Sequence, residues 1–293
     1  TKIDLSTGST HNRLDSIFSE IIEKVNKFNI LEQATHLLVQ GDTASVAALS
    51  LVAFHRKIKV MHLEAGLRTY NKLHPYPEEV YRQFVSRVAD YHFCPTEENK
   101  MNLLSEKTQG EIFVIGNTVL DNLKNIVPSY ENKVLITLHR RENHKLIRSW
   151  FSEIEKLAER YRSIFFCLPL HPNPNVIKHK NILKNVNVVE PMDHNSLLYF
   201  LSKCKVVITD SGGIQEESSF LKKRCIVCRK TTERKEGVGT HAIICDDPSM
   251  LSTIFDSQIK DYTLPKDYIC PYGDGSSAAK LVDIYEKINP ACV

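Results

Sequence analysis

The sequence has no long hydrophobic run, no strong excess of either charge and none of the common nucleotide-binding or hydrolase motifs. No apolar stretch approaches the roughly 18 to 20 residues of a membrane-spanning helix, so we expect no membrane association. The 38 Lys and Arg residues nearly balance the 35 Asp and Glu residues, which indicates no nucleic-acid partner. GxGxxG, a P-loop and GxSxG are absent, which argues against bound NAD or another cofactor and against a serine hydrolase.

The 8 cysteines are scattered, mostly within apolar runs, as is typical of reduced thiols. Only Cys225 and Cys228 form a CxxC, and no second Cys or His pair is near them in the sequence, so we expect no bound metal. No signal-like segment opens the chain, and the stretch Thr1–Thr10 is polar without a strand pattern. These features predict a cytoplasmic protein.

The 293-residue chain is long enough for about two domains. Short β-branched runs alternate with helical segments from residue 35 to residue 245, which is typical of βαβ units in a parallel sheet. We expect a Rossmann-like domain over 1–122 and a second over 123–275, with the breaker-rich Val127–Tyr130 as the hinge. A terminal helix within 276–293 is expected to pack back on the first domain.

The predicted strands fall into two sets. They cover 35–39, 59–63, 91–94 and 112–115 in the first domain, and 134–137, 164–168, 186–189, 206–209, 225–228 and 242–244 in the second. Helices are predicted over 43–55 and 78–89. Because ligands of open α/β sheets bind at the carboxyl ends of strands, the residues just after these strands are the first candidates for a site.

Acidic residues follow the strands of the first domain. Asp42 leaves the first strand and enters a helix, where it either acts as an acid or base or caps that helix. Glu64 ends the next strand, where a buried carboxylate is costly without a partner. Glu78 begins a helix, where it is either functional or a favourable charge for the helix dipole.

Basic residues follow two strands of the second domain. His139 and Arg141 lie directly after residues 134–137 and could form an anion clamp, or equally a surface ion-pair network. His171 lies in a loop that three prolines hold, so its ring is fixed at a strand end.

The strongest motif is Thr209-Asp-Ser-Gly-Gly-Ile-Gln-Glu-Glu-Ser218. At Ser211, Gly212 and Gly213 a strand runs into small residues that expose backbone N–H groups at a helix N-terminus, as a diphosphate site requires; the alternative is a tight turn without a ligand. Glu217, further along the helix, could reach a ribose diol. The polar loop that ends at Arg234 could close the site.

These motifs, in identity and order, resemble those of the non-hydrolysing UDP-N-acetylglucosamine 2-epimerases over roughly residues 31–285. The resemblance implies a glycosyltransferase-B-like fold of two Rossmann-like domains, a homodimer, and interconversion of UDP-GlcNAc and UDP-ManNAc by elimination and re-addition of UDP. It implies a catalytic group and a UDP-binding group, with Arg68 as an allosteric contact. The catalytic residues are Asp42, Glu64, Glu78 and His171; the UDP contacts are Ser211, Gly212, Gly213, Glu217, Arg141, His139 and Arg234.

The chain departs from the family pattern in two places. The family opens with a strand and a Gly-Thr-Arg-Pro-Glu loop, neither of which precedes Gly41, so the N-terminal domain is expected to lack its first strand. Leu197 and Leu198 stand near the position where relatives place an aromatic for the uracil, which weakens base stacking. Two alternatives remain open: a UDP-sugar glycosyltransferase of the same fold, and a non-catalytic UDP-sugar-binding remnant.

Overall fold

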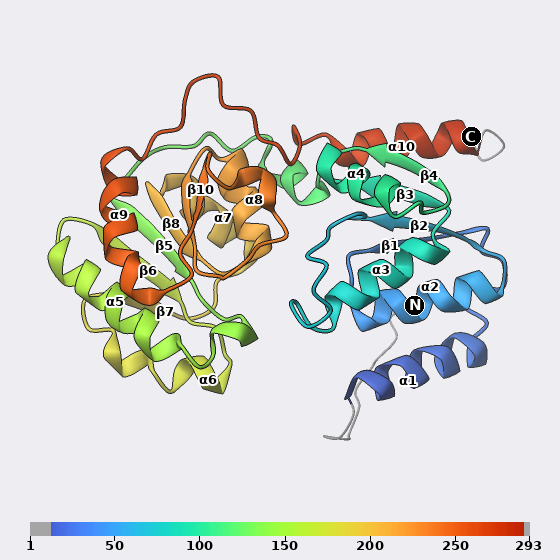
Figure 1. The fold of residues 1–293 in the computed structure, drawn as a ribbon, viewed down its shortest axis with the longest axis horizontal. Helices are drawn as coiled ribbons and strands as arrows, with labels where there is room; N and C mark the ends of the chain where they lie inside the picture. The colour runs from blue at the N-terminus through green and yellow to red at the C-terminus, as the bar shows by residue number, and fades with distance from the viewer. Residues whose placement is uncertain (1–12, 290–293) are drawn as a thin grey trace. The chain divides into compact units, whose positions relative to one another are not determined.

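The computed structural model describes residues 13–289 and divides the chain into two compact units (Figure 1). The first comprises residues 1–117 and 278–293, and the second comprises residues 118–277. Thr1–Thr10, for which the sequence indicates no strand, lies outside the described residues. Within 13–289, no helix combines the length and the apolar character that crossing a bilayer requires.

The first unit is a four-stranded parallel sheet in the order β1-β2-β3-β4. Its strands are β1 (His36–Gln40), β2 (Lys59–Leu63), β3 (Tyr91–Cys94) and β4 (Glu111–Val114); its helices are α1 (Arg13–Lys27), α2 (Ala44–His55), α3 (Glu78–Val88), α4 (Glu97–Ser105) and α10 (Ser277–Ile288).

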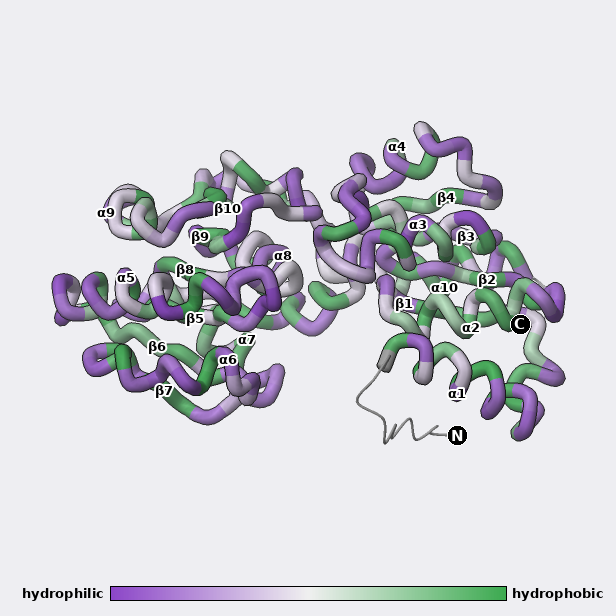
Figure 2. The backbone as a smooth tube through the Cα atoms, turned by 60° about the horizontal axis from the view of Figure 1, so that its bottom comes forward, coloured by the Kyte–Doolittle hydropathy of each residue, from purple (hydrophilic) through white to green (hydrophobic). Residues whose placement is uncertain are grey.

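Helices cover both faces of this sheet, because successive side chains of each strand point to opposite faces and both faces are apolar. Val39 and Val60 pack with α1, α2 and α3 on one face, while Met61 and Phe93 pack with α10 on the other. The tube in Figure 2 alternates between hydrophobic and hydrophilic residues along α1, as expected of a helix with one face on the core.

The second unit is a six-stranded parallel sheet in the order β10-β9-β8-β5-β6-β7. The strands are β5 (Lys133–Thr137), β6 (Phe165–Pro169), β7 (Asn187–Val189), β8 (Val206–Thr209), β9 (Arg224–Val227) and β10 (Ala242–Ile244). The helices and 3-10 turns are η1 (Thr118–Leu123), η2 (Arg141–Asn143), α5 (Ile147–Arg160), α6 (Pro174–Ile177), η3 (Lys180–Ile182), α7 (His194–Lys203), α8 (Gly212–Phe220), η4 (Lys235–Gly237), η5 (Pro248–Met250) and α9 (Leu251–Lys260).

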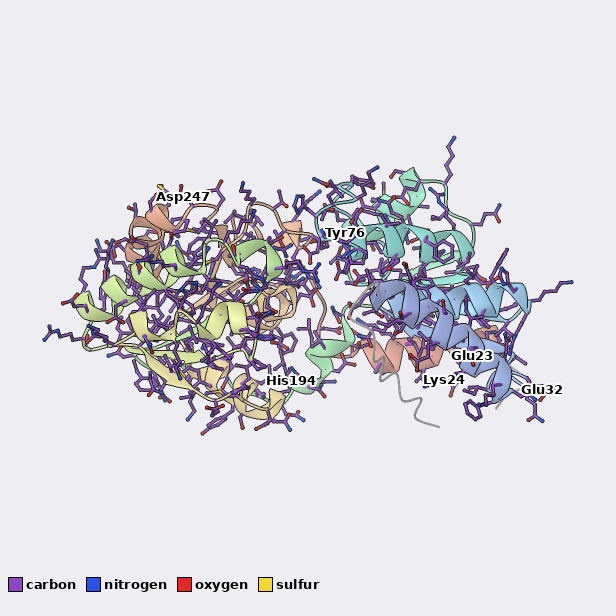
Figure 3. All side chains as sticks on the ribbon, turned by 90° about the horizontal axis from the view of Figure 1, so that it is seen from below. Glu23, Lys24, Glu32, Tyr76, His194 and Asp247 are labelled. Carbon is purple, nitrogen blue, oxygen red and sulfur yellow. The ribbon has the colours of Figure 1, made fainter. Side chains whose placement is uncertain are left out.

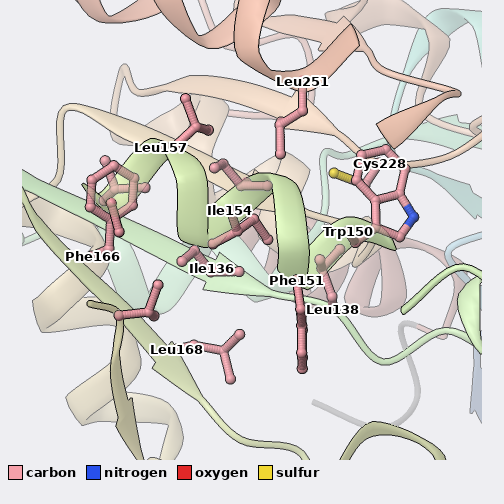
Figure 4. Close-up of a cluster of buried hydrophobic side chains, with 14 of the residues drawn as sticks. Ile136, Leu138, Trp150, Phe151, Ile154, Leu157, Phe166, Leu168, Cys228 and Leu251 are labelled. Carbon is pink, nitrogen blue, oxygen red and sulfur yellow. The ribbon is translucent and has the colours of Figure 1, made fainter. Parts of the chain in front are cut away.

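The larger core of this unit lies between its sheet and α5 (Figure 4). Trp150, Phe151 and Ile154 come from one side of α5 and pack on Ile136 and Leu168 of the sheet. A second cluster covers the opposite face with α7, α8 and η1. The predicted fold class of two parallel α/β domains is therefore confirmed.

The strand order of the second unit places its ligand site. The chain runs outward from β5 to β7 and then returns to β8 on the other side of β5, so β5 and β8 are neighbours at a topological switch point. Ligands of open α/β sheets bind outside the strand ends at such a point.

The segment Val127–Tyr130 belongs to this unit and is tied to it, since the Ser129 N–H donates to the Ser202 carbonyl at 2.9 Å.

Candidate active site

In the first unit, Asp42 and Glu64 lie at the same edge of the sheet. They follow the ends of adjacent parallel strands, where Gln40 of β1 is in register with Leu63 of β2. A Cβ added to Gly41 would lie 3.8 Å from Oε2 of Glu64. The two strand-end loops therefore run close together, as the carboxyl ends of parallel strands must.

Glu64 has an uncommon backbone. Its φ is +59°, in the left-handed region that non-glycine residues rarely adopt. Its carboxylate is held by Gln40, whose Nε2 donates to Oε1 at 2.8 Å. Backbone strain of this kind persists where the surrounding structure enforces it, often at functional sites.

Asp42 pairs with a buried arginine. Arg82, from α3, donates through Nη2 to the Asp42 carboxylate, and its Nη1 lies 3.6 Å from Oε2 of Glu79. The helix-cap interpretation of Asp42 is wrong, because Thr43 caps α2 by accepting from the Val46 N–H at 3.3 Å. The Asp42 carboxylate is thus fixed in direction by the core of its own unit.

Two further residues support the Asp42 loop. Buried His62 lies with Nε2 2.8 Å from the Gly41 carbonyl oxygen, to which it donates. Burial lowers the pKa of His62 to about 3, so the ring is neutral at physiological pH and its Nε2 carries the proton. Glu78 is the first residue of α3, one turn before Arg82, and its side chain is partly exposed.

Arg68 is buried in contacts within its own unit. Its guanidinium forms a two-point ion pair with Glu106, at 2.7 and 3.0 Å, and also donates to the Ser86 hydroxyl. The neighbouring loop is fixed by Glu79, whose carboxylate accepts the N–H groups of Thr69 and Tyr70 at 3.0 Å each. In these contacts Arg68 joins α3 to the end of α4.

In the second unit, Ser211, Gly212 and Gly213 lie at the start of α8, where β8 ends. Ser211 is the N-cap residue, but its side chain makes no capping hydrogen bond. The first N–H groups of a helix have no partner within the helix, and its N-terminus carries a partial positive charge. This end of α8 can therefore bind an anion.

Gly212 and Gly213 have different surroundings. A Cβ on Gly212 would lie 2.7 Å from Cζ of Arg234, whereas a Cβ on Gly213 would meet nothing within 4 Å. Arg234 is buried and donates through Nε to Glu216 at 2.8 Å and through Nη1 to Glu233. Because Gly212 has no side chain, the guanidinium of Arg234 fits beneath the start of α8. Gly213 leaves open space beside the same helix start.

Asp210 fixes the loop after β5 to the end of β8. Its fully buried carboxylate accepts from the N–H groups of His139, at 3.0 Å, and Arg140, at 2.9 Å, and from the Asn143 side chain at 3.0 Å. Arg141, at the start of η2, is exposed. The loop with His139 and Arg141 is therefore held beside the N-terminus of α8.

His139 and His171 stack on one another, with ring centroids 5.0 Å apart and planes inclined by 12°. Burial lowers the pKa of His139, which the nearby Asp210 opposes. Nδ1 of His171 accepts from the Asn173 N–H at 3.2 Å, so in the neutral ring Nε2 carries the proton. His171 can therefore donate a hydrogen bond from Nε2.

A cavity of about 320 Å³ lies against these groups, entirely within the second unit. Its lining includes His139, His171, Ser211, Gly213 and Glu217. The structure brings these predicted residues together around one cavity, while Arg234 lies beneath Gly212. The sequence did not indicate Arg82 or the cavity residue His194, and it showed Asp210 only as part of the Thr209–Ser218 motif, because the partners of these residues are far away in the chain.

The structure has two parallel α/β units. One has carboxylates at its strand ends, and the other has an anion-binding helix start at a topological switch point. These features define a protein of the glycosyltransferase-B-like class. The family described as UDP-N-acetylglucosamine 2-epimerase matches residues 1–286. The UDP-N-acetylglucosamine 2-epimerase of Neisseria meningitidis is 36% identical over 313 residues, covering 96% of this chain and 83% of that protein. That of Bacillus subtilis is 35% identical over 299 residues, covering 94% and 76%.

A solved structure gives the same result. The crystal structure of UDP-GlcNAc 2-epimerase from Neisseria meningitidis bound to UDP-GlcNAc matches with a TM-score of 0.86 and 34% identity, covering 98% of this chain and 85% of that one. The chain belongs to the UDP-N-acetylglucosamine 2-epimerase family, a family of isomerases.

Proposed function

We propose that this protein interconverts UDP-GlcNAc and UDP-ManNAc. The observation that carries the proposal is the start of α8, where Ser211 and Gly213 border a cavity that His171 and Glu217 also line. A helix N-terminus suits a diphosphate, and a buried carboxylate suits a ribose hydroxyl. The carboxylates of the first unit supply the acid and base groups.

The chemistry explains why several acid and base groups are needed. Carbon 2 of the sugar is not next to a carbonyl, so simple proton removal leaves a poorly stabilised carbanion. In the proposed route a base takes the C2 proton and the electron pair of the C2–H bond forms a C1=C2 double bond. At the same time the C1–O bond breaks, and its electron pair leaves with UDP. The product is 2-acetamidoglucal. Return of a proton to the opposite face of C2, with attack of UDP at C1, gives the epimer.

We assign the roles from position and partners. Asp42 and Glu64 are the first choices for acid and base at C2, with Glu78 and His171 as further proton-transfer groups. His139, Arg141 and Arg234 stabilise the departing diphosphate with the N–H groups of α8. Glu217 accepts from the ribose. An allosteric role for Arg68 stays a prediction, as do the homodimer and the cytoplasmic location.

The test is incubation of the protein with UDP-GlcNAc in deuterated water, followed by NMR. The proposal expects deuterium at C2 of the sugar and accumulation of UDP-ManNAc. A glycosyltransferase would need an acceptor and would not exchange the C2 proton. If UDP-GlcNAc binds and neither product appears, the proposed reaction is rejected, and a glycosyltransferase or a non-catalytic UDP-sugar-binding protein remains.

A further inference from the structure

The cavity of the second unit contains a buried acceptor that the protein leaves without a partner. The Glu217 side chain is 4% exposed and lines the cavity beside Ser211 and Gly213. Its Oε2 has no hydrogen-bond partner among residues 13–289. Because an unpartnered buried carboxylate oxygen is costly, a donor that arrives with the ligand would explain it.

His194 holds the other oxygen of Glu217. Its Nε2 lies 3.0 Å from Oε1 of the carboxylate. The residue opens α7, behind the N-cap Asp193, and lies at the surface of the unit with a side chain 49% exposed (Figure 3). Since an ionised carboxylate can only accept, the ring donates from Nε2.

The contact between His194 and Glu217 has a larger energetic effect than an exposed ion pair, because the Glu217 carboxylate is buried. Burial raises the pKa of Glu217, and the hydrogen bond from His194 opposes this shift by stabilising the ionised carboxylate. An ionised oxygen accepts a stronger hydrogen bond than a neutral one. The contact also fixes the carboxylate plane, since rotation would break the bond to Oε1.

We propose that His194 is a positioning residue for the nucleotide, holding Oε1 of Glu217 so that Oε2 accepts a hydrogen bond from a ribose hydroxyl of UDP. The inference rests on the proposed function and deepens it, because it assigns ribose recognition to a pair of residues from α7 and α8. His194 acts through Glu217, so its effect is confined to the part of the ligand that Glu217 contacts.

The experiment measures, by calorimetry, the binding of UDP and of its 2′-deoxy and 3′-deoxy analogues. The wild type should prefer UDP to at least one analogue by about tenfold or more, the usual effect of a hydrogen bond to a charged acceptor. His194→Leu should lose most of that preference. His194→Gln should keep it, because its side-chain amide can donate to Oε1. Asn195→Ala, at the exposed next position of α7, is the matched control and should behave as wild type.

The outcomes separate this inference from the proposed reaction. A His194→Leu variant that keeps the wild-type preference overturns it, as does an equal loss of affinity for all three ligands, which would indicate a general packing role. Failure of the Gln variant to retain the preference also overturns it. If the binding preferences are as expected but no UDP-ManNAc forms, the positioning role of His194 is supported and only the epimerase reaction is rejected. No UDP binding by the wild type contradicts both.

Discussion

Replacing the two glycines at the start of α8 by alanine, one at a time, tests the diphosphate site. In Gly212→Ala the new Cβ would lie 2.7 Å from both Cζ and Nη1 of Arg234, closer than such atoms approach. Arg234 cannot simply swing away, because Glu216 and Glu233 hold its guanidinium in the buried interior. In Gly213→Ala the Cβ meets no atom within 4 Å.

The magnitudes follow from these surroundings. Separating Arg234 from its buried partners costs about 3 kcal/mol, and alanine returns up to about 1 kcal/mol of helix propensity, so Gly212→Ala should lose about 2 kcal/mol. For a unit of this size that lowers Tm by about 4–8 °C. Gly213→Ala should leave Tm unchanged or slightly raised. It should still weaken UDP binding by about tenfold or more, because its methyl group fills the space where the diphosphate approaches the backbone.

Thermal unfolding followed by circular dichroism and calorimetry with UDP measure both effects. A double variant isolates the cause: in an Arg234→Ala background, Gly212→Ala should cost little further stability, since the clashing side chain is gone. The reasoning is refuted by a Gly212→Ala variant as stable as the wild type. It is equally refuted if Gly213→Ala binds UDP with unchanged affinity.

Three other changes have defined outcomes. Asp42→Asn and Glu64→Gln should each lower epimerase turnover by about 100-fold with UDP affinity retained. The control variant Glu98→Gln, at an exposed position, should keep wild-type turnover. Wild-type turnover in both Asp42→Asn and Glu64→Gln would mean that the wrong carboxylates were chosen. Asp210→Asn should lower the free energy of unfolding by about 2 kcal/mol and weaken UDP binding, because it loses hydrogen bonds to the His139 loop. The control Asp246→Asn, at an exposed position, should change neither. Unfolding curves of Asp210→Asn and wild type that coincide would contradict the role of Asp210 in holding this loop. Burial lowers the pKa of Lys223 from 10.5 to about 8, so below pH 8 its charge destabilises the folded state, and this penalty disappears as pH rises towards 10.5. The unfolding free energy of Lys223→Met relative to wild type should therefore fall by about 3 kcal/mol between pH 7 and pH 10.5. A difference independent of pH would show that the pKa of Lys223 is the same in the folded and unfolded states.

The strands were predictable because both sheets are parallel and buried on two faces. Such strands are short continuous apolar runs, and Lys59–Leu63, Tyr91–Cys94, Val206–Thr209 and Ala242–Ile244 begin and end where the sequence predicted. The other strands differ from the prediction by one residue at one or both ends, where the pattern merges into loops.

The partners of the site residues could not be predicted in the same way. Asp42 is 40 residues from Arg82, and His139 is 71 residues from Asp210, so no local spacing connects them. The position of Asp42 suggested a helix cap as readily as a functional group, whereas the structure shows that the neighbouring Thr43 caps the helix. The sequence therefore indicated which side chains stand at strand ends but not what holds them.

The contacts that hold these strand-end side chains have a common consequence for the proposed reaction. Glu64 is held by Gln40, Asp42 by Arg82, and the His139 loop by Asp210, each through contacts within a single unit. Elimination releases UDP and a neutral glycal, and re-addition requires both to remain in position until a proton returns. Groups that are already oriented need no reorganisation as charge develops on the diphosphate. Loosening one of these supporting contacts should therefore increase the release of free UDP and 2-acetamidoglucal relative to UDP-ManNAc, as well as slow turnover.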